Sequence, residues 1–191
     1  MGRNITKDST STILANQVGD WTVVRAFTHI EQDACVGRYC KIGNYCRILR
    51  SAWLGSHVEI EDYVTVPGSV RIDEGALLGA HVTFVEGGHP TAAACAPTLI
   101  GKGARIGART TLLGGVSVGR YAQTDPGTLI TEDVPDHAHI TVSGSKQSGW
   151  VCVCGKELAL PLQGERFITC ACARSYRLSE GHLTKVTQLG D

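Results

Sequence analysis

The stretch Val24-Arg-Ala-Phe-Thr-His-Ile30-Glu-Gln-Asp-Ala-Cys-Val36-Gly-Arg-Tyr-Cys-Lys-Ile42 places a branched apolar residue at every sixth position. The period continues to Phe84 without a miss, and it resumes at Ile100 with one lapse at Thr124. A second series of mostly small residues lies two positions before each large one. The large residues beyond the quoted stretch are Ile48, Leu54, Ile60, Val66, Ile72, Leu78, Phe84, Ile100, Ile106, Leu112, Val118 and Ile130.

A six-residue period fits neither a 3.6-residue helix nor a simply alternating strand. It fits a coil with flat sides, one hexapeptide to each side, because side chains two apart in a strand point the same way. Glycine follows many of the large residues, and we expect these glycines at the corners, where the backbone needs unusual dihedral angles. The sequence therefore predicts an all-β chain folded as a parallel β-helix of hexapeptide repeats.

Three hexapeptides make one coil, so residues 18 apart in the sequence should stack directly. Two aromatic columns follow from this rule, with neighbouring rings about 4.8 Å apart. Such columns either cover a face or pack between subunits, or part of one stacks on a substrate ring. The first column is Phe27, Tyr45, Tyr63 and His81, and the second is Trp21, Tyr39 and His57.

The composition limits the class of protein. A length of 191 residues favours one domain with a small appendage. The 18 basic and 18 acidic residues balance, so no basic surface indicates a nucleic-acid partner. No stretch is apolar enough to span a membrane, and the first residues lack the apolar core of a signal peptide. We expect a cytoplasmic protein with an N-terminal arm (1–20), a β-helix domain (21–149) and a C-terminal module with a tail (150–191).

The period is interrupted by an excursion over residues 85–99. Irregular loops of this length are uncommon in compact domains and often carry function. Glu86 and His89 lie inside it, three residues apart. Gly87 and Gly88 between them give the backbone freedom, and Pro90 and Pro97 stiffen the exits. These two side chains are the first candidates for acid–base chemistry.

Four cysteines near the C-terminus form two Cys-x-Cys pairs separated by fifteen residues: Cys152, Cys154, Cys170 and Cys172. Two cysteine knuckles on a small hairpin are the layout of a structural zinc ribbon, in which four thiolates close the tetrahedron. The metal would supply the folding energy of so small a module. A disulfide pair or free thiols are the alternatives. Cys40 and Cys46 occupy small inward positions, and we expect them to pack in the core.

Several stretches resemble one family of enzymes. They are Ala26-Phe-Thr-His-Ile30, Phe84 to Pro90, Ile130-Thr-Glu-Asp-Val-Pro135 and Gly149-Trp-Val-Cys-Val-Cys-Gly155. Together they resemble the hexapeptide-repeat N-acyltransferases of nucleotide-linked amino sugars, of the type that acetylates UDP-2-acetamido-3-amino-glucuronate or dTDP-3-amino-hexoses. The resemblance covers roughly residues 24–176, and the appendage opening is found on some members of the family.

This resemblance implies a left-handed helix, a homotrimer and active sites in the grooves between subunits. An acyl-CoA, most simply acetyl-CoA, would be the co-substrate and a nucleotide amino sugar the acceptor. His89 would be the base, with Glu86 orienting it or acting itself and His29 as the backup. Lys146, Gly115 and Ser143 would contribute to coenzyme binding.

The chain departs from the family pattern at the donor and acceptor sites. Glu86 stands where the family has asparagine, and Thr124-Asp125-Pro126-Gly127 stands where it has Val-Gly-Ala-Gly. The exit segment, roughly Val142 to Lys146, lacks the arginine that grips the coenzyme. These departures leave two other readings open: a relative with a different acyl donor or a non-sugar acceptor, and a non-catalytic trimeric scaffold.

Overall fold

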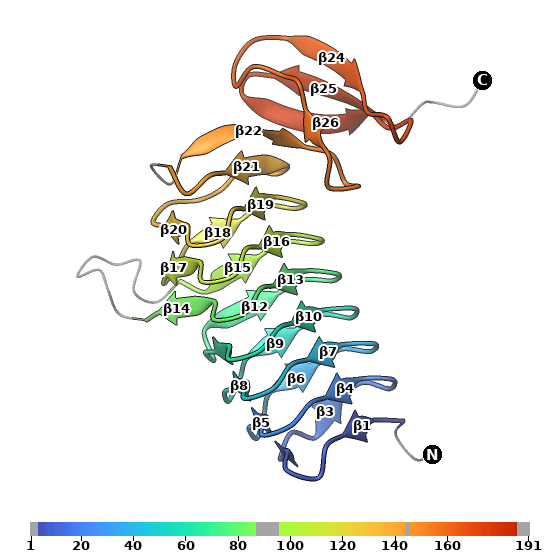
Figure 1. Cartoon of the computed structure of the whole chain (residues 1–191), viewed down its shortest axis with the longest axis vertical. Helices are drawn as coiled ribbons and strands as arrows, with labels where there is room; N and C mark the ends of the chain where they lie inside the picture. The colour runs from blue at the N-terminus through green and yellow to red at the C-terminus, as the bar shows by residue number, and fades with distance from the viewer. Residues whose placement is uncertain (1–3, 87–95, 144–145, 187–191) are drawn as a thin grey trace.

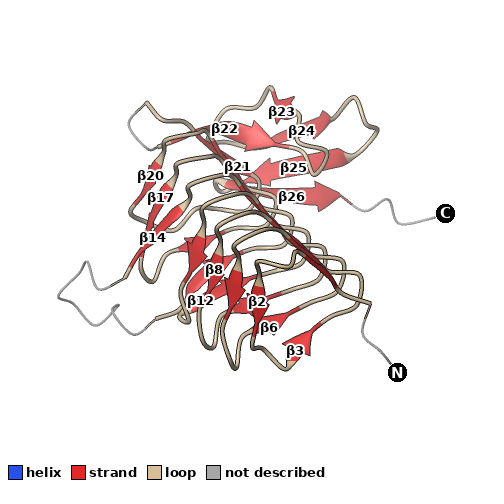
Figure 2. Cartoon of the chain, turned by 60° about the horizontal axis from the view of Figure 1, so that its bottom comes forward, coloured by secondary structure: helices blue, strands red, loops and turns tan. Residues whose placement is uncertain are grey.

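The structure of the chain is a computed structural model that describes residues 4–86, 96–143 and 146–186. It is a column of short strands with three flat sides, topped by a small module at the C-terminal end (Figure 1). Seen more nearly along its axis, the column has a triangular cross-section (Figure 2). The predicted all-β fold and parallel β-helix are therefore confirmed.

The three sides are parallel sheets in which successive coils pair, and the first side continues into the antiparallel strands β22 and β23. The first side contains β1 (Thr6–Lys7), β4 (Val23–Val24), β7 (Lys41–Ile42), β10 (Glu59–Ile60), β13 (Leu77–Leu78), β16 (Arg105–Ile106), β19 (Gln123–Thr124), β21 (Ala138–Ile140), β22 (Gln147–Val151) and β23 (Glu157–Leu158). The second side contains β3 (Gln17–Val18), β6 (Cys35–Val36), β9 (Trp53–Leu54), β12 (Val70–Ile72), β15 (Thr98–Ile100) and β18 (Ser117–Val118). The third side contains β2 (Thr12–Ile13), β5 (His29–Ile30), β8 (Arg47–Ile48) and β11 (Thr65–Val66), followed by β14 (Thr83–Val85), β17 (Thr111–Leu113) and β20 (Leu129–Ile130).

The core is the stack of inward residues that the period predicts. The large members such as Ile42, Ile60 and Leu78 are at most 3% exposed, and they pair in register from coil to coil. Cys40 and Cys46 are fully buried, as predicted, and burial raises the pKa of both thiols.

The corners differ from the prediction in which residue carries the unusual dihedral. Positive φ angles occur three residues after the large residue, at aromatic positions such as Tyr39 and Tyr63. The glycine directly after the large residue has another role. At Gly37 an added Cβ would lie 2.5 Å from the backbone of the next coil. These glycines therefore allow the coils to stack closely.

The first predicted aromatic column forms completely where residues 18 apart meet at a corner, and the second forms for two of its three members. In the first column the ring centroids of Phe27, Tyr45, Tyr63 and His81 are 4.8–4.9 Å apart and nearly parallel. In the second, Tyr39 and His57 stack at 5.0 Å. Because each inner ring has a neighbour on both faces, only the end rings can offer a face to a ligand.

The coil begins earlier than the period indicates. Residues 6–18 form one further coil, with β1, β2 and β3 paired to β4, β5 and β6. Its inward residues include Ser11, whose hydroxyl donates to the Arg25 carbonyl oxygen. A polar residue at an inward position and irregular spacing hid this coil from the period.

The C-terminal module is a three-stranded antiparallel sheet, β24 (Arg166–Thr169), β25 (Ser175–Ser179) and β26 (His182–Val186). Trp150, Tyr176 and Leu178 form its own small core. The Tyr176 ring also meets the edge of His137 at the coil end, with ring centroids 5.3 Å apart. No helix in the described part of the chain is long and apolar enough to cross a membrane.

Candidate functional site

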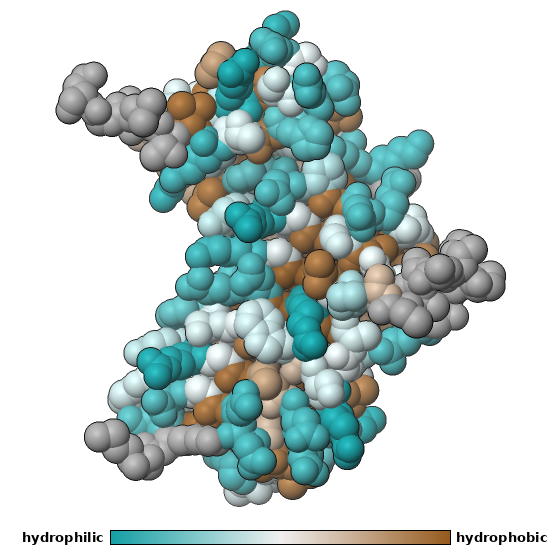
Figure 3. Space-filling model, turned by 180° about the vertical axis from the view of Figure 1, so that it is seen from behind, coloured by the Kyte–Doolittle hydropathy of each residue, from teal (hydrophilic) through white to brown (hydrophobic). Residues whose placement is uncertain are grey.

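A groove runs along the second side of the coil. Its lower part is a cavity of about 510 Å³ between Gln17 and Glu74, and its upper part, of about 440 Å³, lies between Arg71 and Arg120. Trp53 and Asp73 line both parts, so we treat them as one surface, the second-side groove. Figure 3 shows apolar side chains gathered in a band along one face of the coil, bordered by hydrophilic ones.

The groove follows from which residues point outward on this side. The outward column has small side chains at its two ends and large ones between them: Cys35, Trp53, Arg71, Leu99 and Ser117. At the adjoining corner the glycines that let the coils stack contribute no side chain, so the hollow stays open. The upper part is mainly apolar, and two guanidinium groups stand at its edges.

The excursion over residues 85–99 starts and ends at the corner between the third and second sides. β14 ends at Val85 on the third side, and β15 begins at Thr98 on the second side. Glu86 Oε1 accepts a hydrogen bond of 2.8 Å from Ser69 Oγ, which fixes the carboxylate near the start of β12. Its partner in the prediction, His89, lies outside the described residues.

His29 is not brought to the same place. It lies on the third side in β5, half-buried, whereas Glu86 follows β14 three strand steps away. Three strand spacings are about 14 Å, too far for the two side chains to act on one proton.

The predicted coenzyme residues are spread over two corners. Gly115 occupies the corner between the third and second sides with φ of 85°, and its N–H donates to Thr98 Oγ1 at 2.9 Å. Ser143 and Lys146 lie between β21 and β22, and Val142 beside Ser143 is 3.9 Å from an added Cβ at Gly127, at a different corner. The structure therefore does not gather these three residues.

Sequence reasoning missed the residues that line the groove, above all Trp53, Arg71 and Arg120. The signal was present, since Trp53 and Arg71 are 18 residues apart on an outward position. Across the excursion, however, paired residues are no longer 18 apart in the sequence: Leu78 pairs with Ile106 and Ile72 with Ile100. Without that step, Leu99 cannot be aligned with Arg71.

The four C-terminal cysteines do meet. Their Sγ atoms all lie within 4.8 Å of one another, with Cys152–Cys172 at 3.4 Å and Cys154–Cys170 at 3.7 Å. Four sulfurs at about 2.3 Å from one zinc ion are about 3.8 Å apart in a tetrahedron. The donor set and its spacing therefore fit a four-thiolate metal site.

The two knuckles have the same backbone design. In each, the first cysteine exchanges backbone hydrogen bonds across a tight turn, and a residue with positive φ follows the second cysteine: Gly155 in one and Ala173 in the other. The Arg174 backbone and its guanidinium, 3.3 Å from the sulfur, lower the pKa of Cys172 to about 6. Burial raises the pKa of Cys152 to about 12, so a cation would be needed to hold this thiolate at neutral pH.

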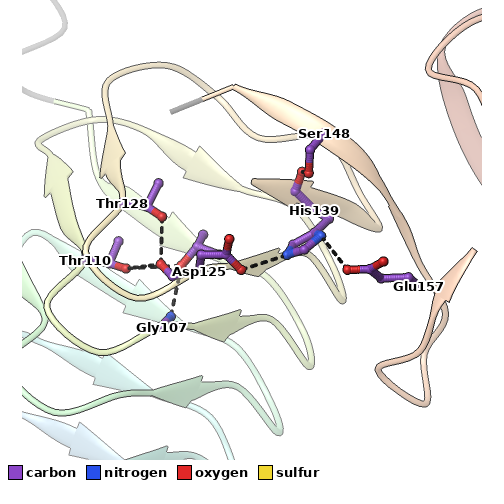
Figure 4. A network of polar contacts seen from close by, with 8 residues as sticks. Gly107, Thr110, Asp125, Thr128, His139, Ser148 and Glu157 are labelled. Atoms are coloured by element: carbon purple, nitrogen blue, oxygen red, sulfur yellow. Dashed lines mark hydrogen bonds and ion pairs between the residues drawn. The ribbon is translucent and has the colours of Figure 1, made fainter. Parts of the chain in front are cut away.

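A polar network joins the coil end to the start of the module (Figure 4). His139 Nε2 lies 3.0 Å from Asp125 Oδ1, and Nδ1 lies 3.3 Å from Glu157 Oε1. Thr124, the lapse in the period, is buried and accepts from the Gly107 N–H at 2.9 Å, next to Thr110 Oγ1 at 3.2 Å. Both imidazole nitrogens face carboxylates, so neither is free for catalysis. His139 joins Asp125 of the coil to Glu157 of β23, and we call this arrangement the clamp.

Replacing His139 by alanine should loosen this clamp. We expect a loss of about 1 kcal/mol, mostly from the contact with Asp125, since Glu157 is three-quarters exposed and screened by water. Thermal unfolding of His139→Ala, of Asp125→Ala and of the double variant measures the coupling energy between the two side chains. A full sum of the two single effects in the double variant would contradict the clamp.

Comparison with known proteins supports the same fold. No protein-family model matches the chain. The chain is 29% identical over 89 residues to the dTDP-3-amino-3,6-dideoxy-alpha-D-galactopyranose 3-N-acetyltransferase of Aneurinibacillus thermoaerophilus, covering 47% of this chain and 45% of that protein. Over about half of its length, the chain is therefore similar to an N-acetyltransferase of a nucleotide-linked amino sugar.

Two further comparisons give one more sequence relative and one structure of the same fold. The bifunctional protein GlmU of Thermosynechococcus vestitus is 30% identical over 126 residues, 66% of this chain. The LpxA structure from Bacteroides fragilis, a UDP-N-acetylglucosamine acyltransferase, matches with a TM-score of 0.51 at 12% identity over 78% of this chain and 74% of that one, which shows the fold alone. The aligned part of the chain spans 45% of the sugar N-acetyltransferase and 27% of GlmU, so it covers half or less of either relative.

Proposed function

We propose that the protein transfers an acyl group, most simply acetyl, from an acyl-CoA to the amino group of a nucleotide-linked amino sugar. The observation that carries this proposal is the Glu86 carboxylate, held by Ser69 directly before β12, whose Arg71 lines the second-side groove. The homology to an acetyltransferase of a dTDP-linked amino sugar gives the reaction class.

The proposed chemistry is attack of a neutral amine on a thioester. The amine nitrogen bonds to the carbonyl carbon, the carbon–sulfur bond breaks, and CoA leaves as the thiol. The amine must lose one proton, and a carboxylate or an imidazole can accept it. Glu86 and His89 together are the proposed base and its partner. We leave His29 out of this pair because β5 lies three strand steps from β14 along the third side.

The second-side groove suits the acyl donor. Trp53 and Leu99 offer apolar surface for the acyl group and its thioester arm, and Arg71 and Arg120 stand at the edges, where a phosphate could be bound. This assignment replaces the scattered set of Gly115, Ser143 and Lys146 as the main coenzyme surface.

We further propose that the four C-terminal cysteines hold a structural zinc ion. Four thiolates fill the tetrahedron and leave no position for a substrate, so the metal would stabilise the module without taking part in the reaction. A homotrimer, a left-handed coil and a cytoplasmic location complete the proposal, in line with the family resemblance.

Thiol release from acetyl-CoA tests the function. The purified protein is supplied with a panel of UDP- and dTDP-linked amino sugars, and Glu86→Gln is compared with it. Removing a general base should lower kcat by about 10²-fold or more while leaving acetyl-CoA binding intact. Glu132→Gln, on the surface after β20, is the matched control and should keep full activity. Full activity in Glu86→Gln would show that this carboxylate is not the base.

The same assay separates the alternatives. Binding of acetyl-CoA without turnover on any sugar would favour a non-sugar acceptor. Neither binding nor turnover would favour a different acyl donor or a scaffold.

A further inference from the structure

One corner of the coil carries a row of aromatic rings with a break in it. The corner between the second and first sides places one residue of positive φ in each coil. In chain order these are Trp21, Tyr39, His57, Gly75, Gly103, Tyr121 and His137. Tyr39 stacks on His57, and Tyr121 stacks on His137 at 5.3 Å, so the two glycines separate two stacked pairs.

The two glycines have different surroundings. At Gly103 an added Cβ would lie 2.6 Å from two carbons of the Tyr121 ring, so this ring already fills that step. At Gly75, apart from the two chain neighbours, no heavy atom of the described residues lies within 4 Å of such a Cβ. Its φ of 70° is not a reason for glycine, because His57 and Tyr39 adopt 59° and 58° at the same corner. The row of rings therefore has a gap at Gly75, with the His57 ring on one side and the Tyr121 ring on the other. We call this gap the missing rung.

The edges of this missing rung are charged. Glu74 and Lys102 form an ion pair of 2.6 Å at the two adjoining corner positions, both exposed, and Lys102 lowers the pKa of the Glu74 carboxyl. The carboxylate can accept from the amino or imino groups of a heteroaromatic ring. Lys102, and Arg120 one coil further on, can meet a phosphate. Arg120 also lines the second-side groove, so the two surfaces are continuous.

We propose that the missing rung at Gly75 is a nucleobase site. The base stacks on the open face of His57, below Tyr121, and its phosphates lie toward Lys102 and Arg120, from where the rest of the ligand enters the second-side groove. This inference rests on the proposed function, because acyl-CoA and nucleotide sugars both carry a base and a diphosphate. The part that both ligands share is a nucleotide, and this is the group that we assign to the corner at Gly75.

The variant Gly75→Tyr tests the site by filling the rung. Tyrosine is already present at this corner and at this φ, so the coil should fold normally. Affinities are measured by titration calorimetry for 3′,5′-ADP, UDP and dTDP. Base stacking on an aromatic side chain is worth about tenfold or more in affinity, so we expect the bound nucleotide to weaken at least about tenfold. His57→Ala should weaken the same nucleotide by removing the ring face.

Asp33→Tyr is the matched control, since it adds a ring at a residue of positive φ on another corner. It should leave all three affinities unchanged. Weakening of 3′,5′-ADP alone would identify the coenzyme base, and weakening of UDP or dTDP the sugar-nucleotide base. Unchanged affinity in both Gly75→Tyr and His57→Ala, with the wild type binding a nucleotide, would overturn this site but not the proposed function. A wild type that binds none of the three would overturn both.

Discussion

Replacing Cys170 by serine is expected to unfold the C-terminal module while the coil stays folded. The module has only a few buried apolar residues, among them Trp150, Tyr176 and Leu178, so its packing alone cannot hold it. A four-thiolate zinc site contributes about 10–16 kcal/mol of apparent binding free energy in small domains, and loss of one ligand removes most of it. Cys170 is buried within the cluster, so a neighbouring group cannot take its place.

Two measurements check this expectation. Elemental analysis should find one zinc per chain in the wild type and little in Cys170→Ser. Amide hydrogen exchange should become fast in β24–β26 and stay slow in coil strands such as β10 and β13. Cys35→Ser is the control, because it makes the same chemical change at a free cysteine outside the cluster. Slow exchange of β24–β26 in a metal-free variant would show that the module folds without the ion.

The coil could be predicted because it repeats one local rule. Each hexapeptide buries a large residue and a small one, so apolar identity at two positions determines the pairing of the next coil. The stacking of Tyr45 on Tyr63 follows from the same count. The rule lapsed at Thr124, where a hydrogen bond replaces apolar burial, and in the first coil, where Ser11 is inward and the spacing is irregular.

The groove and the clamp could not be predicted, because both depend on changes of register. The excursion lengthens one coil, so Leu99 follows Arg71 only once the pairing of Ile72 with Ile100 is known. The last coil is shorter, with Gln123 paired to His139, and this brings His139 to Asp125. In the sequence, Asp125 is noticeable only because it stands where a glycine is expected. Its partner His139 can be recognised only once the shorter pairing of Gln123 with His139 is known.

Gly37→Ala is expected to destabilise the protein strongly although it adds one methyl group. The new Cβ would lie 2.5 Å from Gly55 C and Ser56 N, which are backbone atoms of the next coil and cannot rotate away. The two coils would have to separate locally and strain the hydrogen bond from the Gly37 N–H to the Leu54 carbonyl. Overpacking of this kind costs about 3 kcal/mol, which for a chain of this size lowers Tm by about 6–12 °C.

Gly149→Ala is the matched control for this prediction. Gly149 lies in β22, and no heavy atom of the described residues is within 4 Å of an added Cβ there. The same substitution should therefore change Tm by no more than about 2 °C, since an unhindered Gly→Ala change is worth within about 0.5 kcal/mol. Thermal denaturation of both variants decides between two roles for the glycines that follow the large residues. Equal, small shifts would mean that the coils tolerate a side chain at Gly37, and a large shift confined to Gly37→Ala would mean that the coils need its missing side chain in order to stack.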